Sequence, residues 1–432
     1  MRKKGGDKLM KKRKLTERSG VMKNGKLKTN DRSENGLMKN RMAKRMDRLQ
    51  LLDCLNLTKA GLSTNDMLPV TTHYCFTGTE LITYNGTIGF RIPLVTEFKG
   101  GIPGAVFRAL IEHLHYREIE IKEVEGSLAI KAGREKWSAE SDLPIMPPKA
   151  FLFDFPEPTG EVLPVKMLDL VDRIKAVLRS AHDDASAPER LGVTMLLRDG
   201  QLSCYATDDE TLSHAWLPLP NDYQGPKHVV LPTTFCKELI NLADQDSKLE
   251  LQEKSAVLMF GKGKCLFGRF IVVDHRMDFE GMFDAHYSDR ISEKMIDMPE
   301  RLHSIIDRAV IITEGPSQDA IALMRETAKS GISKTRLSVF DGKALFVSES
   351  SRGRIVDRTE AKQSDCAPVK INPKRLRVFE HYKRFLATED AILMANDNSV
   401  FMVSTSPAKL EEEESRSNKR KREPSRRRPR NM

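Results

Sequence analysis

The segment LPTTFCKELINLA, residues 231–243, recurs in outline at two other places in the chain. The same order of residues is found in IPGAVFRALIEHL (102–114) and INPKRLRVFEHYK (371–383). Each has an apolar residue, a proline one or two positions later, and then apolar residues at helical spacing. Proline is tolerated at the first helical position because its missing N–H would have no partner there. Each segment therefore predicts a short helix that follows a strand.

Strand patterns surround all three short helices. A glycine turn, an alternating strand, a polar turn and a second strand precede them, within 77–94, 198–219 and 340–361. Further strand-like pairs follow them, and a longer amphipathic helix begins each unit, at about 42–57, 165–181 and 299–312. The chain thus repeats the order helix, strands, helix, strands three times, and such a repeat indicates an array of similar structural units.

This repeat predicts an α+β fold of three similar domains, each with two helices packed on antiparallel sheets. The boundaries fall in a Pro-rich stretch near 156–164 and near 284–298. We therefore expect domains at 46–158, 159–284 and 285–406. The segments 1–45 and 407–432 lack a hydrophobic period and are expected to be disordered tails.

The net charge of +10 is unevenly distributed. Residues 1–45 hold 17 Lys and Arg against 4 Asp and Glu, and residues 407–432 hold 10 against 5. These tails leave a net charge of −8 for residues 46–406. The predicted folded body is therefore acidic and lies between two basic tails. Such a body could attract nucleic acid only where its cations are clustered.

An acidic cluster in the middle unit invites a metal or acid–base interpretation. The stretch LSCYATDDETLSHAWL (202–217) contains Asp208, Asp209 and Glu210 close to His214. The acids fall in the polar turn of the hairpin, where the other units have TYNGT and SESSRG. A polar turn explains them without ligands converging from other segments. We expect no metal and no cofactor.

The chain gives little support for an enzyme. The loop FGKGKCLF (260–267) lacks the glycine spacing and the Ser/Thr of a phosphate-binding loop, so a tight hairpin is the better interpretation. The six cysteines form no CxxC pair and no nucleophile lies in a recognised turn. No apolar run approaches the length of a membrane span. We expect a soluble, cytoplasmic, non-catalytic protein without a membrane partner.

Basic residues recur at matched helix positions. Lys166 and Arg173 are seven residues apart, and a shift of 135 places them on Arg301 and Arg308. Arg108 and Lys237 have the same offset from their prolines. The remaining members of this predicted DNA-contacting set are Arg45, Arg48, Lys374 and Arg377. Exposed helix faces also carry such residues routinely, but their repetition in an acidic body favours contact with DNA phosphates without sequence preference.

The sequence resembles the bacterial sliding clamp, the β subunit of DNA polymerase III. CYATDDETL is similar to the family's "ATDGHRL", VVDHRMDFEGMF (272–283) to "LVDGRFPDY", and FMVST (401–405) to the last strand. LPTTFCKELINL resembles the helix between them, and the likeness spans about 46–406. It implies a ring of two head-to-tail subunits around duplex DNA, with sheets continuous across domain boundaries.

The resemblance also implies partners: a DNA polymerase, a clamp loader and other proteins that dock a short peptide between the second and third domains. By motif, the pocket residues are Thr207, Asp209, Glu210, Thr211, Leu212, Met277, Met282, Met402, Val403, Ser404, Thr405 and Ser406. The family's Gly-His-Arg turn is here Asp209-Glu210-Thr211, and its terminal Met-Pro-Met-Arg-Leu is replaced by STSPAKL. This divergence and the odd tails suit a phage-encoded clamp acting at the nucleoid in a host cytoplasm. The alternative hypothesis is a DNA-compacting protein that binds through its basic tails without encircling DNA.

Overall fold

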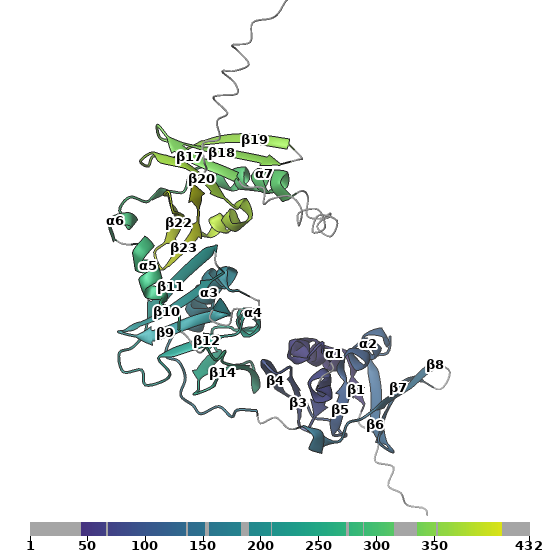
Figure 1. Cartoon of the computed structure of the whole chain (residues 1–432). Coiled ribbons are helices and arrows are strands. Elements are labelled where there is room, and N and C mark those ends of the chain that lie inside the picture. The colour runs from purple at the N-terminus through teal and green to yellow at the C-terminus, as the bar shows by residue number, and fades with distance from the viewer. Residues whose placement is uncertain are drawn as a thin grey trace, which may run out of the picture. The chain divides into compact units, whose positions relative to one another are not determined.

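A computed structural model describes residues 45–65, 68–134, 137–151, 155–182, 190–208, 210–273, 276–287, 289–314, 335–350 and 353–407 (Figure 1). The predicted tails 1–45 and 407–432 lie outside the described residues, apart from Arg45 and Pro407, and so does Asp209. Helices and strands follow one another in the predicted order three times, which confirms the α+β fold of repeated units.

Among its described residues, the first unit has two α-helices, three 3-10 helices and eight strands, and seven of these strands have counterparts in the later units. Its elements are β1 (Met46–Asp47), α1 (Arg48–Thr58), the 3-10 helices η1 (Lys59–Gly61) and η2 (Pro69–Thr72), β2 (His73–Phe76), β3 (Glu80–Tyr84), β4 (Ile88–Pro93), β5 (Gly100–Pro103), α2 (Gly104–His113), β6 (Glu118–Val124), β7 (Ser127–Arg134), β8 (Trp137–Pro144) and η3 (Pro148–Ala150).

The second unit has the same order. Its elements are α3 (Met167–Val177), η4 (Leu178–Ser180), β9 (Val193–Arg198), β10 (Gln201–Thr207), β11 (Thr211–Pro218), β12 (His228–Leu231), α4 (Thr233–Leu242), β13 (Lys248–Leu251), β14 (Ser255–Phe260) and β15 (Lys264–Arg269). A connector follows, with α5 (Phe279–His286), α6 (Asp289–Ser292) and β16 (Ile296–Asp297).

The third unit repeats the order once more. Its elements are α7 (Leu302–Glu314), β17 (Thr335–Phe340), β18 (Lys343–Ser350), β19 (Gly353–Glu360), β20 (Cys366–Ile371), the 3-10 helix η7 (Pro373–His381), β21 (Arg384–Ala387), β22 (Ala391–Asn396), β23 (Ser399–Ser404) and β24 (Ser406–Pro407).

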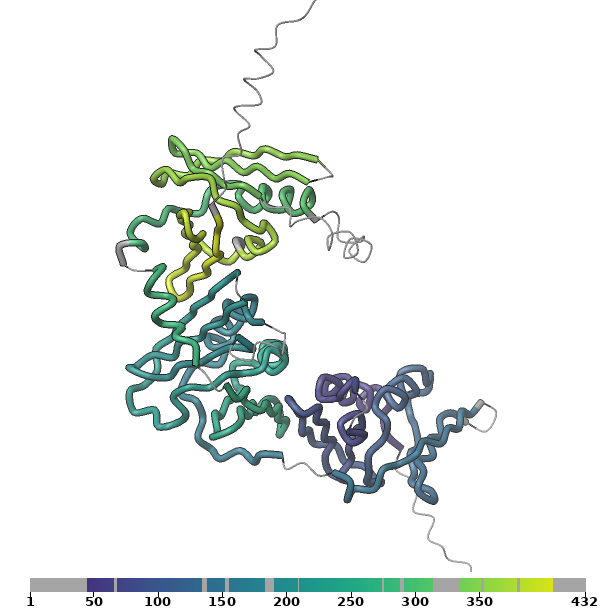
Figure 2. The backbone as a smooth tube through the Cα atoms, viewed as in Figure 1, coloured from purple at the N-terminus to yellow at the C-terminus, as the bar shows by residue number. Residues whose placement is uncertain are grey.

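Two of the four described sheets run from one unit into the next. The strand orders are β1-β6-β7-β8, β13-β14-β15-β4-β3-β2-β5, β12-β9-β10-β11-β23-β22-β21-β16 and β19-β18-β17-β20-β24. In the second of these β15 pairs with β4, and in the third β23 lies beside β11 (Figure 2). Both junctions are therefore continuous hydrogen-bonded sheet, as the resemblance implied.

Each unit also has an apolar core of its own. Phe107 of α2 is fully buried in the first core, Phe235 of α4 in the second and Phe385 of β21 in the third. The second core includes Ile88 and Phe90 of β4, so it extends across the first junction. Three clusters agree with three domains, while the boundaries 46–158, 159–284 and 285–406 stay predictions.

The helix ends differ from the sequence predictions in small ways. Pro103 and Pro232 stand one residue before the first helical residue of α2 and α4, rather than at it. The Pro232 carbonyl already accepts a hydrogen bond from the Cys236 amide at 3.0 Å, which is the first bond of the helix. The proline thus occupies the cap, where a missing N–H is equally harmless.

The third short helix is of the 3-10 type rather than α. In η7 the Arg375 amide donates to the Asn372 carbonyl three residues earlier at 3.1 Å, which is the 3-10 pattern. The Asn372 side chain accepts from the Lys374 amide at 3.1 Å and so binds an N–H that the start of a helix leaves unpaired.

The long helices begin later than predicted. The first starts at Arg48, where the Asp47 carboxylate accepts from the amides of Leu49 and Gln50 at 2.9 and 3.2 Å. The other two start at Met167 and Leu302. Lys166 and Arg301 therefore precede their helices, in matched positions, instead of lying on them.

A fourth apolar cluster lies on the other face of the sheet that joins the second and third units. Phe279 and Phe283 of α5 pack on Tyr205 and on strands of both units. His214 of β11 is 7% exposed there and stacks on Tyr205 with a centroid distance of 4.2 Å. Neither ring nitrogen has a hydrogen-bond partner among the described residues. Burial lowers the pKa of His214 to about 3.

This burial predicts an acid-sensitive contribution to stability. The unfolded chain protonates this imidazole near pH 6.5, whereas the folded chain keeps it neutral. The contribution of His214 to the free energy of unfolding is fully present above the pKa of the unfolded chain. It decreases by about 1.4 kcal/mol per pH unit as the pH falls toward the pKa of the folded chain. Denaturant unfolding between pH 6.0 and 4.5 should therefore show a shallower pH dependence for His214→Phe than for the wild type. Equal slopes would mean that the native imidazole takes up the proton.

Candidate functional site

Four of the ten predicted DNA-contacting cations are paired with acids. Arg308 makes a two-pronged pair with Asp357, with its Nη2 at 2.7 Å and its Nε at 3.2 Å. Other pairs are Arg45–Glu118 at 3.0 Å, Arg108–Glu112 at 2.9 Å and Arg377–Asp307 at 3.7 Å. The hydrogen bond with Asp357 raises the pKa of Arg308. These cations would have to be shared with, or released from, their acids to hold a phosphate.

Arg48 has a structural role in the first unit. Its Nη1 donates to the carbonyls of Ile111 and Glu112 at 3.2 and 3.3 Å, at the end of α2. A cation there satisfies carbonyls that the helix leaves unpaired and meets the negative end of the helix dipole. Its Nε is buried without a partner among the described residues. Arg48 therefore joins the two helices of its unit.

A third group is exposed at or near helix starts and on helix surfaces. Lys166 immediately precedes α3, Lys237 lies on α4 and Lys374 on η7, and all three are exposed. Arg301 is also exposed, and its φ of 64° places it in the left-handed region directly before α7. The structure thus supports the matched positions of Lys166 and Arg301, while contact with DNA stays a prediction.

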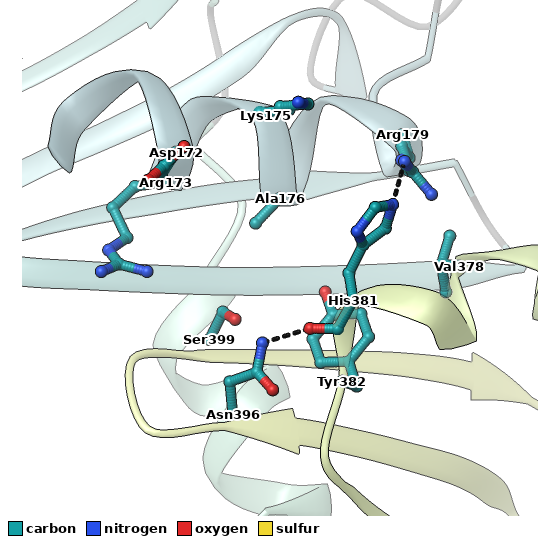
Figure 3. Close-up of a pocket in the computed structure, with 10 residues that line it drawn as sticks. All are labelled: Asp172, Arg173, Lys175, Ala176, Arg179, Val378, His381, Tyr382, Asn396 and Ser399. Atoms are coloured by element: carbon teal, nitrogen blue, oxygen red, sulfur yellow. Dashed lines mark hydrogen bonds between the residues drawn. The ribbon is translucent and has the colours of Figure 1, made fainter. Parts of the chain in front are cut away.

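Arg173 differs from its counterpart Arg308. It lines a cleft of about 260 Å³ between α3 and the β22–β23 hairpin (Figure 3). The complete lining is Asp172, Arg173, Lys175, Ala176, Arg179, Val378, His381, Tyr382, Asn396 and Ser399. Sequence reasoning missed Lys175 and Arg179, although their spacing of four along α3 and η4 places them on one face. We call this the α3–hairpin cleft.

The partner-pocket residues are divided between two faces of the joined sheet. Leu212 and Met402 are directly opposite in β11 and β23 and lie in the fourth cluster, 7% and 4% exposed. Met277 packs against this cluster, while Met282 of α5 is 38% exposed. Phe279 and Phe283 cover the same face, so a partner peptide there would have to compete with α5.

Most of the other described pocket residues are buried at this junction or form hydrogen bonds with its backbone. Thr207 and Thr211 are buried, and Val403 lies in the third core on the opposite face. Ser404 donates from its amide and hydroxyl to the Glu210 carbonyl at 2.8 and 3.1 Å. Thr405 donates to the carbonyls of Glu389 and Asp390, and Ser406 of β24 pairs with Lys370 of β20. Alternation along a strand explains this division between faces.

The acids of the middle hairpin join the second unit to the third. The Arg375 guanidinium lies 2.6 Å from Asp208 Oδ2 and 3.0 Å from Glu210 Oε2. Asp208 also accepts from the amide and hydroxyl of Thr211, at 2.9 and 2.7 Å. The predicted β10–β11 hairpin is confirmed. Its turn adds an ion-pair connection to η7 that the sequence did not reveal, because Arg375 is 165 residues from Glu210.

Two features of the described residues bear on the enzyme hypothesis. FGKGKCLF forms the β14–β15 hairpin, with Phe260 paired to Lys264, as predicted. Cys75 and Cys204 are fully buried, and burial raises the pKa of each to about 12. A thiol held protonated in an apolar core is a poor nucleophile.

No family model matches the chain, and no curated protein matches it. Solved structures do match. The β subunits of DNA polymerase III from Thermotoga maritima and Pseudomonas aeruginosa are 15% and 18% identical, and the DNA polymerase β subunit from Streptococcus pyogenes is 17% identical. Each match has a TM-score of 0.67 and covers 84% of this chain and 99% of the other. This chain therefore has the fold of the DNA polymerase III β subunit, the bacterial sliding clamp.

Proposed function

We propose that this chain is a DNA sliding clamp, a non-catalytic processivity factor. It encircles duplex DNA without sequence preference and tethers a DNA polymerase and other peptide-docking partners. The likeness over 84% of the chain supports this proposal. The observation that carries it lies within the chain. The same kind of junction between strands occurs twice, and among the described strands β8 and β19 are unpaired edges that could form a third.

Both junctions follow one rule of register. At the first, Ile88 begins β4 and pairs with Gly268, four residues after Lys264 closes the β14–β15 hairpin. At the second, Thr211 begins β11 and pairs with Val403, four residues after Ser399 closes the β22–β23 hairpin. The returning strand of one unit thus always meets the last hairpin of the next.

The same two roles remain open at the ends of the chain. β19 is the returning strand of the third unit and the edge of its sheet. β8 ends the last hairpin of the first unit and is the edge of its own sheet. Exposed edges of this kind promote pairing with another chain. Pairing β19 with β8 of a second copy gives a closed head-to-tail homodimer.

The rule also gives the register of this proposed interface. Trp137 closes the β7–β8 hairpin, so Gly353 at the start of β19 is expected opposite Ser141. Arg354 then lies opposite Glu140, and Ile355 opposite Ala139. Opposite charges at directly facing positions stabilise a strand pair by about 0.2–1 kcal/mol. Arg354 and Glu140 are both exposed, although Glu140 also accepts from Lys131 at 3.0 Å within its own unit.

The exposed cations before and on the helices would meet the DNA. With a body of net charge −8, attraction is confined to those positions. A clamp loader and the polymerase complete the proposed set of partners, and no cofactor is required. No described helix is long and apolar enough to cross a membrane. We place the protein in the cytoplasm, on the DNA.

A disulfide at the proposed interface provides a topological test. Directly opposite residues have Cα atoms about 4.5–5.5 Å apart, which suits a disulfide. The full chain carrying Glu140→Cys and Arg354→Cys, mixed with nicked circular DNA and then oxidised, should give a dimer that stays on the circle in denaturant. Cutting the DNA once should release it, and both steps are read on denaturing gels.

The matched control is Glu140→Cys with Val356→Cys, which is two residues out of register on the same strand face and should cross-link poorly. Denaturant that strips the cross-linked dimer from uncut circles would show binding through the tails or the surface instead of encirclement. That result would favour the DNA-compacting alternative.

Charge reversal tests the register in the unmodified ring. Arg354→Glu or Glu140→Arg alone places like charges opposite each other at both interfaces and should weaken the dimer about tenfold. The double variant should recover most of the loss. Sedimentation across a dilution series measures the dissociation constant, and Glu123→Arg on β6 is the control for a similar charge change elsewhere. Absence of recovery in the double variant would contradict the register.

A further inference from the structure

The α3–hairpin cleft contains cations that have no acid partner among the residues that the structure describes. Arg173, Lys175 and Arg179 form no ion pair with any described carboxylate. Arg308, on the corresponding long helix of the third unit, does have one. The only carboxylate in the lining is Asp172. Three cations thus surround a hollow that one acid does not neutralise.

One wall of the cleft shows where an anion would be accepted. An Arg179 Nη2 lies 2.6 Å from His381 Nε2 (Figure 3). A guanidinium only donates, so this imidazole nitrogen must be the unprotonated acceptor. A neutral ring nitrogen is a weaker acceptor for a guanidinium than an anionic oxygen. The position next to Arg179 is therefore occupied by a group that an anion could replace.

The remaining polar groups hold the cleft in shape. Asn396 donates to the His381 carbonyl and accepts from the Lys383 amide at 3.0 Å. The Tyr382 hydroxyl is hydrogen-bonded to Ser399. At the other end of the same helix, Arg173 is half-buried and its Nε has no partner among the described residues (Figure 3). The hollow thus has a fixed floor and cations on its rim.

We propose that this cleft is a phosphate-binding site that takes one backbone phosphate of duplex DNA. A phosphate carries several anionic oxygens, and the Arg179 guanidinium can share them with the ammonium of Lys175, one turn earlier on the same face. The cleft is formed partly by α3, the helix that Lys166 precedes, so it lies among the cations that would meet the duplex. The DNA assignment rests on the proposed clamp function, whereas the phosphate chemistry does not.

The site would also join two units. Its cations come from the second unit, while His381 and Asn396 come from the third. A phosphate held by Arg179 and the opposite wall would stabilise that junction in the same place on every subunit. Anion binding should therefore be visible as added stability of the free protein, without DNA.

The first experiment compares thermal unfolding of the full chain in inorganic phosphate and in chloride at equal ionic strength. Phosphate should raise the Tm of the wild type, and Arg179→Gln with Lys175→Gln should remove that increase. Both side chains are exposed, so the double variant should fold. Lys262→Gln, in the β14–β15 turn, removes a charge outside the cleft and should keep the increase. An equal phosphate effect in the double variant would overturn the site.

The second experiment identifies the source of the phosphate. Affinity for a short linear duplex is measured against salt, where each phosphate contact contributes about 0.9 to the logarithmic slope. Arg179→Gln with Lys175→Gln should lower the slope by about one contact and the affinity about tenfold relative to Lys262→Gln. Arg179→Lys should keep most of the slope. A phosphate effect on Tm with an unchanged slope would assign the cleft to a free phosphate ester and overturn the DNA assignment.

These readouts are separate from the test of encirclement. Suppose that the wild-type ring stays on closed circles but Arg179→Gln with Lys175→Gln does not change the salt dependence of duplex affinity. The clamp function would then be supported, and the assignment of the cleft to DNA would be refuted. A wild type that is stripped from circles would refute the clamp, while the thermal comparison would still decide whether the cleft binds phosphate.

Discussion

Unpaired strand edges are the constraint on which this structure depends. Each unit presents one edge from its returning strand and one from its last hairpin, and backbone N–H and C=O groups left there favour a partner strand. The chain satisfies two such edges internally, through β4 with β15 and β11 with β23. The cores follow from this arrangement, since Ile88 and Phe90 of the first unit complete the core of the second. Packing and hydrogen bonding therefore both extend across the first junction.

The sequence predicted the repeated unit because its signals are local. Prolines before short helices, polar hairpin turns and helical periodicity each need only a dozen residues, and all three copies were located in this way. The junctions came only from the family resemblance, since the pairing of Leu212 with Met402 leaves no trace in nearby residues. The ion pairs of Arg375 with Asp208 and Glu210 were missed for the same reason. What looked like a plain polar turn is part of an interface between units.

Candidate binding residues were the hardest to predict, because charge alone does not show whether a cation is already occupied. Arg173 and Arg308 are equivalent in sequence, yet Arg308 is paired with Asp357, whereas Arg173 forms no ion pair with a described carboxylate. Lys175 and Arg179 became informative only when His381 was placed opposite them. In the pocket motif, Leu212 and Val403 looked like neighbours, but they face different cores. Only the three-dimensional structure shows which cations are already paired with acids and which are available to a ligand.

The pairing of β11 with β23 also has a consequence for how the chain is made. Residues 211–215 of the middle unit pair with residues 399–403 of the third unit, which are made much later. During synthesis, the edge of the middle sheet stays open until residues 399–403 have left the ribosome. Contacts of such long sequence separation form slowly, and an open edge meanwhile exposes the chain to wrong pairing with another copy. The synthesis of β23 thus determines when the middle unit is protected from aggregation.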